Sequence, residues 1–228
     1  MKISPIAILY LASVVVCAIL LVINPEIIMV QGLFLGGVVI TAVSIFYFMS
    51  QQIGVGKTFL LFVLSAGVGF VMEYLGVNEG TTFSHYYYTD FLGPKIGNVP
   101  YLIPISWFTA LTTAFLAARL ILGFGKRTNK LLLFTLASLL SVVYDLPIEY
   151  MAMYVWESWV WPDGGIFLGV PLLNFIGWFV VAFIVFGLGA GAWRSLNKTA
   201  RGYHELQIVC FSAFALTVFH MVLDILTK

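Results

Sequence analysis

The chain has 228 residues, of which 61% are hydrophobic and 9% charged, with a formal net charge of +1 and a mean hydropathy of +1.04. Soluble domains carry about a quarter charged residues, so this composition excludes a soluble globular protein. The small net charge gives no indication of a nucleic-acid partner. We therefore expect an all-α integral membrane protein with a single transmembrane domain, residues 1–228.

Apolar segments of membrane-crossing length recur along the chain. A helix needs about 20 apolar residues to cross a bilayer, and such segments are predicted at 4–23, 27–49, 57–76, 101–122, 131–154, 171–193 and 205–226. With these seven crossings, every Lys and Arg except Lys95 and Lys228 falls on one side. Cytoplasmic loops are enriched in Lys and Arg, so we predict a cytoplasmic N-terminus.

Two segments of the chain share a pattern of Val-Pro followed two turns later by Trp-Phe. The pattern occurs at Val99-Pro100 with Trp107-Phe108 and at Val170-Pro171 with Trp178-Phe179. Each copy opens a predicted span and follows an aromatic, glycine-rich loop and a span that carries an acid. We predict a parallel repeat of helix–loop–helix units, approximately 57–122 and 131–193, related by an axis along the membrane normal.

Four acids lie in or at the edges of three predicted spans: Glu73, Asp145, Glu149 and Asp224. An ionisable side chain at membrane depth costs several kcal/mol, so such residues are candidates for function. Asp145 and Glu149 are four residues apart and share a helix face. Two carboxyl groups so close in a low dielectric do not easily both ionise, so one is expected to keep a proton and act as a proton donor. The structural alternative is a polar patch that holds neighbouring helices together.

The other embedded polar groups allow two interpretations each. Glu73 either lines the same chamber as the Asp145–Glu149 pair or caps the membrane surface. His220 and Asp224, again four residues apart, form either a helix-orienting hydrogen bond or a pair of metal ligands. Because no cysteine–histidine cluster or histidine-rich motif accompanies them in the sequence, we predict no metal site.

Aromatic residues, with 20 Phe, 11 Tyr and 6 Trp, exceed what an interfacial belt requires. Aromatic faces stabilise cations, and they suit a long polyene or prenyl chain. An aromatic cavity around protonatable acids is therefore suited to carbocation chemistry.

Several motifs occur in order between about residues 67 and 180: Glu73-Tyr74-Leu75-Gly76-Val77-Asn78-Glu79-Gly80, Tyr86-Tyr87-Tyr88-Thr89-Asp90-Phe91-Leu92-Gly93-Pro94, Val99-Pro100 through Trp107-Phe108, Trp159-Val160-Trp161, and Gly169-Val170-Pro171-Leu172-Leu173-Asn174-Phe175-Ile176-Gly177-Trp178. Together they resemble the CruF-type carotenoid 1,2-hydratase family. The resemblance implies a multi-pass enzyme of a bacterial or archaeal cytoplasmic membrane. It would add water to the terminal C1=C2 double bond of a lipophilic acyclic carotenoid, with membrane lipid around it and no cofactor.

Acid-catalysed hydration assigns roles to the embedded acids. A proton is delivered to the less substituted carbon, and water captures the tertiary cation. We expect Asp145 to donate the proton, Glu149 to keep Asp145 protonated, and Glu73 to position the water or accept its proton. The residues expected to bind substrate are Tyr74, Tyr86, Trp107, Asn174 and Trp178.

Two other functions fit the same residues. A membrane carotenoid or isoprenoid cyclase or isomerase begins with the same protonation but excludes water, so its product has the mass of its substrate. A small proton-coupled carrier also has embedded acids and internal repeats.

Overall fold

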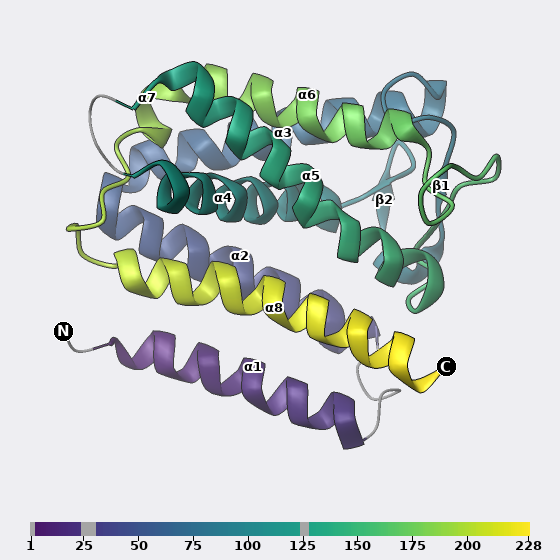
Figure 1. Ribbon diagram of the computed structural model, residues 1–228, viewed down its shortest axis with the longest axis horizontal. Helices are drawn as coiled ribbons and strands as arrows, with labels where there is room; N and C mark the ends of the chain where they lie inside the picture. The colour runs from purple at the N-terminus through teal and green to yellow at the C-terminus, as the bar shows by residue number, and fades with distance from the viewer. Residues whose placement is uncertain (1–2, 24–30, 124–127) are drawn as a thin grey trace.

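The computed structural model describes residues 3–23, 31–123 and 128–228 and shows a bundle of long helices that lie side by side (Figure 1). The helices are α1 (Pro5–Ile23), α2 (Gln31–Ile53), α3 (Val55–Glu79), α4 (Leu102–Leu122), α5 (Lys130–Tyr154), α6 (Leu172–Leu188), the short α7 (Ala190–Trp193) and α8 (Tyr203–Thr227). By length and composition, six of the described helices can cross a membrane, and α6 is an apolar helix of 17 residues. The all-α class and the membrane character are therefore confirmed, whereas the count of seven spans and the orientation stay predictions.

Local sequence signals account for several helix boundaries. The side chain of Asn129 accepts hydrogen bonds from the backbone N–H groups of Leu131 and Leu132, which caps the start of α5. Gly80 takes the left-handed conformation, with φ of 64°, and its N–H bonds to the carbonyl of Gly76 to end α3. The acids near the ends of α3 and α5, Glu73, Asp145 and Glu149, line the same cavity.

The connections at that end form two short antiparallel ribbons, which the sequence did not predict. β1 (Tyr87–Tyr88) follows α3 and pairs with β4 (Trp159–Val160), which follows α5. β2 (Lys95–Ile96) pairs with β3 (Val99–Pro100), after a single 3₁₀ turn at Asp90–Leu92. The β1–β4 ribbon joins the loops after α3 and α5, so it brings their aromatic side chains over one site.

Helix α4 is the most deeply buried helix and packs against α2, α3 and α5. Helix α1 lies at the edge of the bundle and packs mainly on α8, and the two run in the same direction (Figure 1). The backbone N–H of Ser4 donates to the carboxylate of Glu205 at 3.3 Å, which ties their starting ends together.

Candidate active site

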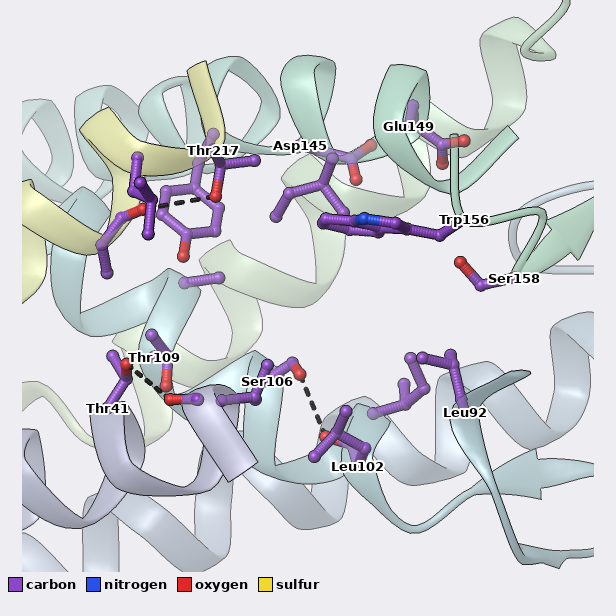
Figure 2. A pocket seen from close by; sticks show the side chains of 18 of the residues that line it. Thr41, Leu92, Leu102, Ser106, Thr109, Asp145, Glu149, Trp156, Ser158 and Thr217 are labelled. Atoms are coloured by element: carbon purple, nitrogen blue, oxygen red, sulfur yellow. Dashed lines mark hydrogen bonds between the residues drawn. The ribbon is translucent and has the colours of Figure 1, made fainter. Parts of the chain in front are cut away.

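A cavity of about 510 Å³ opens among α1, α2, α4, α5 and α8 beneath the β1–β4 ribbon. Its walls are mostly apolar, and Figure 2 shows Asp145 and Glu149 on one wall with Thr41 and Thr109 on the opposite one. Five of the six tryptophans of the chain line it: Trp107, Trp156, Trp159, Trp161 and Trp178. Most of the tryptophans therefore face a common interior space rather than a lipid interface.

Glu73 of α3 is buried and accepts three hydrogen bonds. The hydroxyls of Tyr86 and Tyr88 both donate to Oε2, the latter at 2.7 Å, and the ring N–H of Trp107 donates to Oε1 at 2.9 Å. Burial first, and the neighbouring Glu73 second, raise the pKa of Tyr86 and of Tyr88 well above the usual value of a phenol. Both hydroxyls therefore stay protonated and serve as donors. Glu73 lines the cavity, which decides between the two interpretations of this residue in favour of the chamber.

Glu149 of α5 is buried and also accepts three hydrogen bonds. The ring N–H groups of Trp159 and Trp161 donate to Oε2 at 2.9 and 3.0 Å, and the amide of Asn174 donates to Oε1 at 3.0 Å. All three donors are N–H groups, and a carboxylate can only accept. The environment of Glu149 is therefore built for the ionised form.

Asp145 lies one turn before Glu149 and has a different environment. The amide nitrogen of Asn174 donates to its Oδ2 at 2.9 Å, so Asn174 bridges the two acids. Its Oδ1 is buried and has no hydrogen-bond partner among the described residues; we call this atom the open oxygen of Asp145. Buried polar atoms are almost always paired, so an open carboxyl oxygen at a cavity wall is suited to contact a bound molecule.

Trp107 and Trp178 stack with ring centroids 4.0 Å apart and an interplanar angle of 26°. Two glycines allow rings to approach this closely. A Cβ at Gly69 would lie 2.5 Å from the ring of Trp107, and one at Gly177 would lie 2.4 Å from Phe83, which stacks on Trp107. The stacked faces form an aromatic wall beside the acids.

The structure brings most of the predicted site residues together but moves two of them away. Asp145, Glu149, Glu73, Tyr86, Trp107, Asn174, Trp178 and His220 line the cavity. Tyr74 is 42% exposed, lies against Gly97 and is not part of the cavity wall. Asp224 accepts a hydrogen bond from Tyr150 at 2.9 Å and pairs with Lys228 at 2.9 Å, also outside the wall. Tyr74 is therefore not part of the cavity wall in this structure, and Asp224 is not placed to join His220 at the cavity.

The cavity residues that were not predicted as site residues from the sequence include Tyr88, Ser158, Trp159 and Trp161. Trp159 and Trp161 are two residues apart at the short strand β4 and the residue after it; in extended backbone this spacing places both side chains on one face and was an available signal. Within the described ranges, no group of three or more His, Cys, Asp or Glu is placed to hold a metal ion.

The fold and the site define an integral membrane protein with a buried acidic centre in an aromatic cavity. The family described as "Carotenoid biosynthesis protein" matches residues 30–228, so the chain belongs to that family. A curated relative is the bisanhydrobacterioruberin hydratase of Haloarcula japonica, which is 33% identical over 134 residues. That match covers 55% of this chain and 44% of the relative, less than half of its length. No solved structure matches this chain.

Proposed function

We propose that this protein is a hydro-lyase that adds water to the terminal C1=C2 double bond of an acyclic carotenoid. The observation that carries the proposal is the open oxygen of Asp145, on a buried carboxyl group at the wall of an aromatic cavity. Family membership supports carotenoid chemistry, and the name of the Haloarcula relative supports hydration. The likeness to that relative covers only part of each chain, so the activity is proposed on the site chemistry as well.

The proton that starts the reaction comes from Asp145. Asn174 holds Asp145 and Glu149 against one another, and two such groups in a dry site do not easily both carry charge. Glu149 receives three N–H donors and Asp145 only one. Because each donor favours the charged form, the shared proton resides on Asp145, and Oδ1 is where it can reach the substrate.

The chemical steps balance without any further reactant. The O–H bond of Asp145 breaks as its proton bonds to C2, and the π electrons of the double bond leave C1 as a tertiary cation. A water oxygen bonds to C1, and the proton that this water releases returns to the Asp145 carboxylate. The net change is one water added and a tertiary alcohol formed, with the enzyme restored.

The cation is stabilised by fixed charge and by aromatic faces. The carboxylates of Glu73 and Glu149 line the cavity and are held by three donors each, so they need no reorganisation when charge develops. The stacked Trp107–Trp178 wall adds cation–π attraction. Since both oxygens of Glu73 already accept hydrogen bonds, we assign it this electrostatic role in preference to the positioning of water.

A cyclase or isomerase is the second candidate, because it starts with the same protonation. The polar atoms of the wall favour hydration. Besides the open oxygen of Asp145, the hydroxyl of Ser158 is buried and lacks a partner in the described part of the chain, so a water has polar groups to bind. A carrier would not require a proton donor beside stacked indole rings.

The test is pigment analysis of a lycopene-producing bacterial host that expresses this chain. We expect a more polar pigment that is heavier by one water, and a loss of at least about 100-fold with Asp145→Asn, the usual contribution of a general acid. Asp224→Asn is the matched control, because Asp224 is another acid in a long apolar helix but lies outside the cavity wall. A product of unchanged mass would favour the cyclase, and full activity of Asp145→Asn in folded protein would refute the assigned role.

A further inference from the structure

The cavity has a second polar region, which the proposed reaction does not use. Thr109 of α4 and Thr41 of α2 lie toward one end of the cavity, and Glu149 and Ser158 lie toward the other end (Figure 2). Tyr10 of α1 also lines the cavity, and its hydroxyl is 2.9 Å from the hydroxyl of Thr41. This end therefore gathers three hydroxyl groups from three helices inside an otherwise apolar space.

Thr109 differs from the other hydroxyl residues near it. The hydroxyl groups of serine and threonine in apolar helices usually donate a hydrogen bond to the backbone carbonyl of the preceding turn. Ser106 does so to Leu102 at 3.0 Å, and Thr113 does so to Thr109 at 2.9 Å. The hydroxyl of Thr109 is buried, only 6% of the residue is exposed, and no described residue pairs with it.

The Tyr10–Thr41 pair leaves an acceptor beside it. The proton of the Thr41 hydroxyl is directed to the carbonyl of Gly37, at 2.8 Å. Tyr10 must then donate to Thr41, and its phenolic oxygen keeps lone pairs that can accept. A ligand hydroxyl at this end of the cavity can therefore pair with the Thr109 hydroxyl, and the phenolic oxygen of Tyr10 offers a further acceptor.

We propose that Thr109, with the Tyr10–Thr41 pair, forms a subsite for a hydroxyl group of the substrate. An unpaired hydroxyl in an apolar site costs free energy that a ligand hydroxyl removes. The inference rests on the proposed function only for the identity of the ligand as an isoprenoid chain. Tyr10 lies on α1, outside the family match of residues 30–228, whereas Thr41 and Thr109 lie within it.

The size of the cavity limits where the hydroxyl group is carried. The cavity-lining residues extend from Leu102 to Ala110 on α4, from Ala213 to His220 on α8 and from Tyr10 to Leu21 on α1. At 1.5 Å per residue these stretches are about 10–17 Å long, which is short compared with a whole carotenoid. The hydroxyl group therefore lies on the same end of the chain as the double bond that reacts.

Pigment retention by purified protein in the Asp145→Asn background tests the subsite without turnover. The probes are lycopene and an acyclic carotenoid with a hydroxyl group on the end that carries the terminal double bond. We expect the hydroxylated pigment to be retained about two- to tenfold better, the equivalent of one neutral hydrogen bond. Thr109→Val should abolish this preference and leave lycopene retention unchanged, and Tyr10→Phe should reduce it.

Thr113→Val is the matched control, since Thr113 is a buried threonine one turn along α4 whose hydroxyl is already bonded and which does not line the cavity. Thr109→Val should fold, because it removes an unpaired polar group without changing the shape of the side chain. Equal retention of the two pigments, retention of neither, or a preference that survives both Thr109→Val and Tyr10→Phe would overturn the subsite. A preference without hydratase activity in the unsubstituted protein would instead refute the proposed function alone.

Discussion

Glu73 and Glu149 occupy corresponding surroundings in the two halves of the molecule. Glu73 lies on α3, which precedes β1, and Glu149 lies on α5, which precedes β4. Each accepts two hydrogen bonds on Oε2 from aromatic residues spaced two apart in the loop that follows its helix. Each receives its third donor on Oε1 from the next helix, Trp107 in one half and Asn174 in the other. The same carboxylate environment is thus built twice with different donor groups.

The halves differ at the position four residues before each glutamate, which is Gly69 in one half and Asp145 in the other. Gly69 leaves room for the ring of Trp107, since a Cβ there would lie 2.5 Å from it. Asp145 instead places a second carboxyl group beside Glu149 through Asn174. Among the described residues, the first half therefore has a single carboxylate at the cavity wall, Glu73. Only the second half places a carboxylate, Glu149, beside a proton donor, Asp145.

The ribbon between the halves supports the predicted repeat of units 57–122 and 131–193. The aromatic triplets Tyr86-Tyr87-Tyr88 and Trp159-Val160-Trp161 meet there, and their central residues Tyr87 and Val160 are directly paired. A two-fold axis that relates the two units would pass between Tyr87 and Val160. Trp107 and Trp178 are equivalent positions in the two units, and the same axis would pass between their stacked rings. The repeat stays a prediction that this correspondence favours.

Neutralising each glutamate in turn should distinguish the two carboxylate sites most clearly. Glu149→Gln should lower hydration activity about 100-fold. The amide nitrogen of the new glutamine would face the amide nitrogen of Asn174, and this would displace Asn174, which also holds Asp145 in place. Glu73→Gln should lower it only about tenfold, through lost electrostatic stabilisation. Product formation per folded protein, measured in the same host, gives both values.

The matched pair also separates stability from chemistry. Glu73→Gln places an amide nitrogen against the donors around Glu73 just as Glu149→Gln does around Glu149, so both variants should lose about 1–3 kcal/mol of stability. Apparent unfolding temperatures in detergent report that loss. Equal activity losses in the two variants would mean that the halves contribute equally and that the bridge from Asn174 to Asp145 has no special role.

Gly69→Ala probes the feature that distinguishes the first half. The added methyl group would collide with the ring of Trp107, so we expect a loss of about 1–3 kcal/mol of stability by overpacking. Activity should fall about tenfold as Trp107 shifts from Glu73 and from Trp178. Gly67→Ala is the control, since a Cβ there meets nothing within 4 Å. If the two alanine variants behave alike in unfolding and activity assays, the close approach of Trp107 to α3 does not matter.

The sequence predicted the helices and the acids for simple physical reasons. Apolar runs of about 20 residues have few alternatives to membrane-spanning helices, and a charge within such a run is conspicuous. The spacing of Asp145 and Glu149 placed them on one face, and the structure joins them through Asn174. Seven predicted spans correspond to six long helices and the 17-residue α6.

The errors lie where contacts depend on loops or on the rotation of a helix. Tyr74 was expected in the cavity wall, but neighbouring residues on a helix point in different directions, and Tyr74 lies against Gly97 while Glu73 lines the cavity. The contacts of Trp159 and Trp161 with Glu149 depend on the β1–β4 register, which no pattern in the sequence fixes. Nor does a sequence show that one oxygen of Asp145 stays open while its other oxygen is bonded.

The smallest expected effect distinguishes the equivalent indoles. Trp178→Phe keeps an aromatic face in the wall but weakens cation–π attraction, for which indole is the best ring, so we expect a loss of about threefold. Trp107→Phe loses the same attraction and also removes the ring N–H that Glu73 accepts at 2.9 Å, so its loss should be larger, about tenfold. Initial rates of hydration for the two variants decide the order. A larger loss for Trp178→Phe would show that the cation lies against its face alone, and that the hydrogen bond from Trp107 to Glu73 organises the fold without contributing to the reaction.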